Sequence, residues 1–273
     1  MMRLLPLLLL SLAGCQHLLE RPAVEAVALP TGRDFRKGNL IIHTDAEVSE
    51  SHPLFLELST FPEQVCRTLE LPVSDKLIHI YLFSDKLKYE EYIHFEFKDI
   101  PNRRALFVKR PSSSPLKQDQ LQVLCYWGDR IQDDLRHELT HATLHGILHD
   151  VPLWLDEGLA MYFEVGLAAQ GRHRRVLDAM EPAVQAGTWR SDLPRLEALK
   201  DVSQMSVVDY QEVWAWVHYL MHSSPLQRSR LKEYLKERLR PGVTVKTLPI
   251  LNQQESLQLH LKQLLADRSN WPH

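Results

Sequence analysis

The spacing of apolar residues changes near Gly128, and this change limits the folds that the chain can adopt. Before Gly128, short runs of alternating or β-branched residues predict strands at residues 39–43, 77–83, 105–109 and 121–127. After Gly128, apolar residues recur at helical spacing as far as the C-terminus. Strands followed by helices predict an α+β fold, in which a small mixed β-sheet in the N-terminal half packs on a helical half.

Helical spacing also occurs twice before Gly128. It extends from residue 47 to residue 71, where Pro53 and Pro62 predict that the segment is divided. Residues 85–95 predict another helix, with Ser84 as its N-cap.

The first fifteen residues resemble the signal peptide of a bacterial lipoprotein. Arg3 is followed by an apolar stretch that is too short to span a bilayer, and then by Leu12-Ala13-Gly14-Cys15. This tetrapeptide is similar to a lipobox, which implies that Cys15 is lipidated and becomes the mature N-terminus. We therefore expect a signal peptide at 1–14, a lipidated tether at 15–34 and one folded domain at 35–273. Gln16 implies sorting to the outer membrane, on its periplasmic face; an ordinary cleaved secretory signal is the alternative.

The formal net charge is −3 and no basic face recurs along the chain, which argues against nucleic acid as a partner. The basic run 172–175 is consistent with a solvated helix start or with a site for an anion or lipid headgroup. Cys66 and Cys125 form a disulfide or remain free thiols, since an exported compartment permits either. Composition does not identify the oligomeric state.

The pattern His137-Glu138-x-x-His141 predicts a metal site. Residues four apart lie on one face of a helix, so His137 and His141 can bind one Zn²⁺. Glu138 is turned by about 100° from His137 and can reach a water on the metal instead. Zn²⁺ lowers the pKa of such a water, and Glu138 is expected to take its proton as general base while a carbonyl is attacked.

A hydrolytic zinc site needs a third protein ligand and one open position. His145 and His149 continue the four-residue spacing, but each step drifts by about 40°, so a straight helix does not bring three histidines round one ion. A metzincin layout would need glycine at Leu144 and histidine at Ile147, and neither matches. We therefore expect His145 and His149 to line the helix end or the rim of the cleft.

The segment from Trp154 to Glu164, which follows Pro152, is similar to the W-L-N-E-G-F-A segment of the gluzincin metallopeptidases, the clan that includes thermolysin and the aminopeptidase N group. Carried over by position, the resemblance implies that Glu157 is the third ligand, and Asp156 stands where that group usually has asparagine. The nearest resemblance is to the peptidase MA-like (DUF1570) family, whose H-E-L-T-H and P-x-W-L-x-E-G-L-A segments match over about thirty residues.

Two further residues complete the predicted site. Glu164 follows Glu157 by seven residues on the same helix face, so we expect it to accept the second N–H of a ligand histidine; a solvated glutamate is the alternative. The resemblance also implies a tyrosine or histidine that stabilises the oxyanion. Tyr210 is similar in placement to the tyrosine of the aminopeptidase segment P-Y-E-K-G, whose glycine is absent here; His218 and Tyr219 are its rivals.

Together these residues predict a zinc peptidase anchored to a membrane in the bacterial envelope. The aminopeptidase segment G-x-M-E-N is absent, which favours an endopeptidase. We expect a peptide or protein substrate, whose backbone pairs with strand 121–127 if that strand is the sheet edge beside the cleft. The alternative is an envelope-assembly or binding lipoprotein that keeps the zinc fold and does little hydrolysis; the presence of Glu138 and of the ligands favours the enzyme.

Overall fold

The computed structural model describes residues 27–98, 100, 103–112, 119–242, 248 and 253–271. In this part of the chain five strands form one sheet in the order β1-β2-β3-β5-β4. The strands are β1 (Arg33–Lys37), β2 (Leu40–Thr44), β3 (Ile78–Phe83), β4 (Ala105–Arg110) and β5 (Gln120–Tyr126). The two outer pairs are antiparallel and the two inner pairs are parallel, so the predicted mixed sheet is confirmed.

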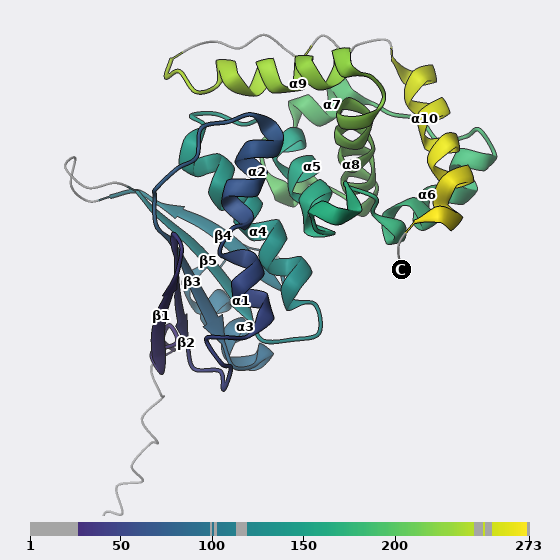
Figure 1. Cartoon of the computed structure of the whole chain (residues 1–273). Helices are drawn as coiled ribbons and strands as arrows, with labels where there is room; N and C mark the ends of the chain where they lie inside the picture. The colour runs from purple at the N-terminus through teal and green to yellow at the C-terminus, as the bar shows by residue number, and fades with distance from the viewer. Residues whose placement is uncertain are drawn as a thin grey trace, which may run out of the picture.

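Helices cover both faces of the sheet and make up the rest of the described chain (Figure 1). Those associated with the sheet are α1 (Pro53–Leu58), α2 (Phe61–Leu69), α3 (Lys86–Glu96) and α4 (Ile131–Ile147). Those of the helical half are α5 (Leu153–Glu164), α6 (Arg174–Gln185), α7 (Leu193–Ala198), α8 (Val207–His222), α9 (Pro225–Glu237) and α10 (Gln254–Asp267). The predicted α+β architecture, strands first and helices after, is therefore confirmed.

Proline and capping residues determine where the early helices begin. Pro53 is the first residue of α1 and Pro62 lies in the first turn of α2, so the predicted division at these prolines is confirmed. The prediction of Ser84 as the N-cap of α3 is wrong. The cap is Asp85, whose carboxylate accepts a hydrogen bond from the backbone N–H of Lys88.

The N-terminal expectations lie largely outside the described residues, including the signal peptide at 1–14 and the lipidation of Cys15. β1 begins at Arg33, at the end of the expected tether. No helix in the described ranges is long and apolar enough to cross a bilayer. Cys66 and Cys125 are both buried and both are free thiols.

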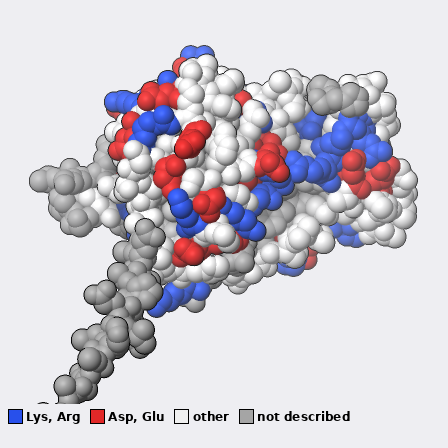
Figure 2. Space-filling view, turned by 90° about the horizontal axis from the view of Figure 1, so that it is seen from below, with Lys and Arg blue, Asp and Glu red and all other residues white. Residues whose placement is uncertain are grey.

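Basic and acidic side chains are interleaved on the surface, as the face drawn in Figure 2 shows. The basic run 172–175 leads into α6 and follows this pattern. Arg175 pairs with Asp133 at 2.7 Å, and Arg174 donates a hydrogen bond to the carbonyl of Arg268. These contacts agree with the interpretation of the run as a solvated helix start.

Helix α4 connects the two halves, because it contacts β4 and β5 on one side and α5 on the other. Leu135, Leu139 and Ala142 are fully buried and recur at helical spacing along the face of α4 that packs in the core. The helix is therefore fixed along its length, and the side chains of its remaining face are held in a constant position relative to the sheet.

Helix α5 is the central helix of the molecule, and it approaches α8 closely at Gly158. A methyl group at Gly158 would lie 2.7 Å from the carbonyl oxygen of Val213 and 2.7 Å from Cγ2 of Val217. Only glycine permits this backbone separation, because the nearest atom belongs to the main chain of α8 and cannot rotate away.

We expect Gly158→Ala to lower the free energy of unfolding by about 1–3 kcal/mol, because the added methyl group forces α5 and α8 apart. Urea denaturation of the purified protein measures this change. Gly146→Ala is the matched control in α4: its methyl group would meet the flexible end of Leu121, 3.0 Å away. There the helix propensity of alanine, worth about 1 kcal/mol, offsets the crowding. Equal stability changes in the two variants would contradict this account of Gly158.

Candidate metal centre

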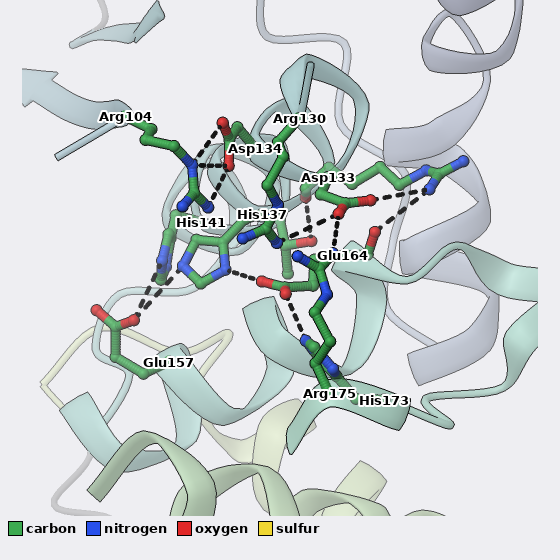
Figure 3. Close-up of polar contacts among 12 residues, drawn as sticks. Arg104, Arg130, Asp133, Asp134, His137, His141, Glu157, Glu164, His173 and Arg175 are labelled. Atoms are coloured by element: carbon green, nitrogen blue, oxygen red, sulfur yellow. Dashed lines mark hydrogen bonds and ion pairs between the residues drawn. The ribbon is translucent and has the colours of Figure 1, made fainter. Parts of the chain in front are cut away.

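Three ligand-type side chains from α4 and α5 converge on one point, as Figure 3 shows. His137 and His141 lie one turn apart on α4, and Glu157 lies near the start of α5. Oε2 of Glu157 is 3.5 Å from Nε2 of His137 and 3.8 Å from Nε2 of His141. The structure therefore brings together the three residues that the sequence indicated as ligands.

The spacing and chemistry of these three side chains fit a divalent metal ion. With zinc–ligand bonds of about 2.0–2.1 Å, the ligand atoms of a tetrahedral site lie about 3.3 Å apart, close to the separations seen here. Oε2 of Glu157 is buried and has no hydrogen-bond partner among the described residues. A buried carboxylate oxygen without a partner is unfavourable, and a cation would stabilise it.

The carboxylate of Glu164 contacts the ring nitrogen of His137 that is not directed at Glu157. Nδ1 of His137 lies 2.8 Å from Oε2 of Glu164, and Oε1 of Glu164 lies 2.6 Å from Nε2 of His173 (Figure 3). Burial raises the pKa of Glu164, but the hydrogen bonds from the two histidines outweigh it and hold that pKa well below its usual range. An ionised Glu164 accepts an N–H from each ring, so Nδ1 of His137 is a donor and Nε2 is directed at Glu157, where loss of its proton leaves a lone pair for a metal ion.

Asp156 lies beside His141. Nδ1 of His141 lies 3.0 Å from Oδ1 of Asp156, whose Oδ2 lies 2.8 Å from Nε2 of His145. Nδ1 of His141 and Oδ1 of Asp156 have no hydrogen-bond partner among the described residues. His141, His145 and Asp156 also form a second group of possible metal ligands. Because His141 directs Nε2 at Glu157, we assign it to the first group.

The histidines of the group are proton-binding sites when no metal ion is bound. Burial lowers the pKa of His141, but Asp156 and Glu157 outweigh burial and raise it to about 9. Burial also opposes protonation of His137, and Glu157 and Glu164 outweigh it and raise its pKa well above the usual value. A metal ion that binds these Nε2 atoms at neutral pH must therefore displace protons.

Glu138 lies beside the ligand group without belonging to it. Its Oε2 accepts a hydrogen bond of 2.7 Å from the backbone N–H of Phe107 on β4. Burial raises the pKa of Glu138, although His137 and His141 act in the opposite direction. Glu138 is thus a positioned carboxylate with a higher proton affinity than an exposed glutamate.

Glu138, His141 and Glu157 line a cleft of about 370 Å³ between the two halves of the protein. Phe107 contributes to the wall from the sheet, and residues 200–203 contribute to it from the helical half. A second cavity of about 460 Å³ shares lining residues with this cleft. His141 and Glu157 therefore face a space that can accommodate part of a peptide.

Of the three residues considered for the oxyanion role, Tyr210 lies near the carboxylates of the cleft. Burial and the charge of Glu157 raise the pKa of Tyr210 to about 12, while the positive charge of Arg103 acts in the opposite direction. His218 is buried and bonded to a histidine of α10 at 2.9 Å. Tyr219 is buried in the core against a tryptophan of its own helix.

His145 and His149 lie at the end of α4, where the sequence indicated. His149 lies beyond the end of α4, is exposed, and belongs to neither ligand group; His145 lines the second cavity. The condition for substrate pairing with strand 121–127 is not met, because this strand corresponds to β5, which lies between β3 and β4 rather than at an edge. The edge beside Glu138 is β4. Apolar periodicity identifies strands but not their order, which depends on long-range pairing.

The chain matches no protein-family model and no curated protein. The similarity to gluzincins therefore remains a prediction, carried by the H-E-L-T-H and W-L-D-E-G-L-A segments. What the structure defines is an α+β fold with a candidate metal centre in a cleft.

We expect one metal ion per chain, bound by His137, His141 and Glu157. Glu157→Ala should weaken metal binding by more than about 100-fold, since even the outer partners of metal ligands contribute about 10–100-fold. Glu164→Gln should fall within that smaller range. A competition titration with a chromophoric chelator measures each affinity. His149→Ala is the control and should bind as tightly as the wild type; loss of the metal in that variant, with retention in Glu157→Ala, would contradict the ligand assignment.

Proposed function

We propose that this protein is a zinc-dependent peptidase of gluzincin type, with Zn²⁺ held by His137, His141 and Glu157. The observation that carries the proposal is the convergence of two imidazole Nε2 atoms and one carboxylate in a cleft, beside a separate buried carboxylate, Glu138. Three protein ligands and an open side are typical of catalytic zinc sites, whereas structural sites are closed by four.

A bound Zn²⁺ would supply a water of lowered pKa and would polarise the carbonyl under attack. Glu138 would take the proton of that water as general base and pass it to the leaving amine. The hydrogen bond from Phe107 occupies one oxygen of Glu138 and fixes the carboxylate, so the other oxygen can receive the proton. Burial favours this role, because it raises the proton affinity of the carboxylate.

We further propose that the substrate is an extended peptide that pairs with β4. The N–H of Phe107 points away from β5 toward Glu138, so the alternation of an antiparallel strand directs Ala105 and Lys109 to the same open edge. Backbone groups on such an edge can hydrogen-bond an added strand. A cleft with two adjoining cavities suits residues on both sides of the cleaved bond, which favours an endopeptidase.

Glu138→Gln should keep zinc and lose hydrolysis. The amide is nearly isosteric but cannot accept the proton, and general-base catalysis contributes about 10²–10⁴ in rate, so we expect a decrease in kcat at the upper end of that range. The assay is cleavage of a fluorogenic peptide by the zinc-loaded protein, with zinc content measured for each variant. Glu233→Gln, on α9, is the control and should retain activity.

A variant Glu138→Gln that holds zinc and cleaves at the wild-type rate would exclude this mechanism. A wild type that binds zinc but cleaves nothing across a broad peptide library would favour the alternative of an envelope-assembly or binding lipoprotein.

We propose that the protein is attached to a bacterial membrane by lipid on Cys15, with its domain in the periplasm. The order of charged start, apolar core, small residues and cysteine supports this assignment. Cys15→Ser should abolish labelling by a radioactive fatty acid and move the protein to the soluble fraction, because acyl chains on one cysteine provide the stable anchor. If the variant stays in the membrane fraction to the same extent as the wild type, the anchor assignment is wrong.

A further inference from the structure

Three histidines of the helical half form a cluster that belongs to neither group of possible metal ligands in the described chain. His218 and His222 lie one turn apart on α8, and His260 lies on α10. Nδ1 of His218 is 2.9 Å from Nε2 of His260, and the ring centres of His218 and His222 are 4.5 Å apart. Nε2 of His222 is 2.9 Å from the hydroxyl of Tyr162 on α5. The histidine cluster therefore joins α8 to both α10 and α5.

Two of these histidines occupy positions at which apolar side chains usually hold helices together. Helix α10 packs against α6 and α8 (Figure 1), and His260 lies between Leu257 and Leu261 on its buried face. Both leucines are fully buried, His260 is 9% exposed and His218 is 2% exposed. Apolar residues would stabilise this contact at every pH, whereas an imidazole in the same place is favourable only while it is neutral.

The hydrogen bonds of the cluster also favour neutral rings. Nε2 of His218 is buried and has no hydrogen-bond partner among the described residues. A positively charged His218 would therefore carry a buried N–H without an acceptor, which is unfavourable. The bond between His218 and His260 needs one ring to donate and the other to accept, so it is lost when both rings are protonated.

The surroundings of His222 and His260 oppose protonation. Burial lowers the pKa of His222 to about 4, and the charge of Arg228 on α9 acts in the same direction, while the backbone of Gln170 opposes it. Burial also lowers the pKa of His260 to about 4, and the charge of His222 adds to this effect.

His218 is the most deeply buried of the three. Burial lowers its pKa well below the ordinary value, and the charges of His222, His260 and Arg172 act in the same direction. Arg172 precedes α6, so cations approach the cluster from two further segments of the helical half. The other titratable groups in ring contact with the cluster are two phenols: Tyr162 of α5 and Tyr219 of α8.

We propose that the histidine cluster is a pH-sensitive contact, which holds α10 on α8 at neutral pH and releases α10 in acid. Protonation places a cation in a buried site beside other cations, and release of α10 lets the charged ring reach water. Because the pKa values of His222 and His260 in the folded protein lie below 6.5, the stability that these rings contribute is present above pH 6.5 and is lost as the pH falls toward 4. This inference does not depend on the proposed peptidase function.

The test compares the full chain with His260→Gln and with the double variant His222→Gln/His260→Gln. Glutamine keeps a polar side chain and is neutral at every pH. His149→Gln is the matched control, because His149 is exposed and lies outside the cluster. Urea denaturation at about pH 7.5 and about pH 5 gives the unfolding constant of each protein at the two pH values. The histidines of the metal centre are the same in all of these proteins, so their titration cancels from the comparison.

Acidification should raise the unfolding constant of the wild type about 10- to 30-fold more than that of His260→Gln, as a pKa lowered from 6.5 to about 4 implies. For the double variant the difference should reach about 10²–10³-fold, because two titrating groups are removed. His149→Gln should respond to pH as the wild type does.

Hydrogen exchange of the wild type supplies a measurement that needs no variant. After correction for the intrinsic exchange rate, the amides of α10 should lose more protection on acidification than those of α2, which carries no histidine. Equal acid sensitivity of the wild type and the double variant would overturn the proposal. The same conclusion follows if α10 in the wild type keeps its protection as well as α2 does, or if His149→Gln and His260→Gln respond alike.

Discussion

The contacts between the histidines of α4 and the carboxylates of α5 are the interactions on which the candidate site depends. Asp156, Glu157 and Glu164 are held in a largely buried layer, and each faces a histidine of α4 at 2.8–3.8 Å. An unpaired carboxylate in such a place is unfavourable by several kcal/mol, so the polar face of either helix is stable only against the other. The packing of α4 on the sheet and of α5 on α8 then sets the distance between the two faces.

Both halves of the protein contribute residues to the cleft. The sheet half contributes Arg103 and residues of β4, while the helical half contributes residues of α5 and residues 200–203. The close approach of α8 to α5 at Gly158 carries the first turn of α8 toward Glu157. Electrostatic groups from both halves therefore act on one small volume, where the low dielectric strengthens their effect.

Local patterns in the sequence were sufficient to predict much of the fold. Four of the five described strands, the division of an early helix at Pro53 and Pro62, and the long α4 all follow from apolar periodicity and from proline geometry, which depend on neighbouring residues; β1 was not predicted. Ligand spacing on one helix is equally local, so His137, Glu138 and His141 could be recognised directly. Glu157 was reached through the similarity of the α5 segment to known metallopeptidases, and Glu164 through its spacing of seven residues from Glu157 on the same helix face.

What the sequence alone determined is therefore the set of helices and strands and the polar face of each helix at the site. The tertiary structure alone decided that β4 rather than β5 is the open edge, because strand order depends on pairings between distant segments. It also decided that Asp156 lies between His141 and His145, that Glu164 joins His137 to His173, and that Arg103 lines the cleft. These contacts join residues from different helices and strands, so they cannot be predicted from spacing along the sequence. Their distances are fixed only when both halves of the folded chain pack together.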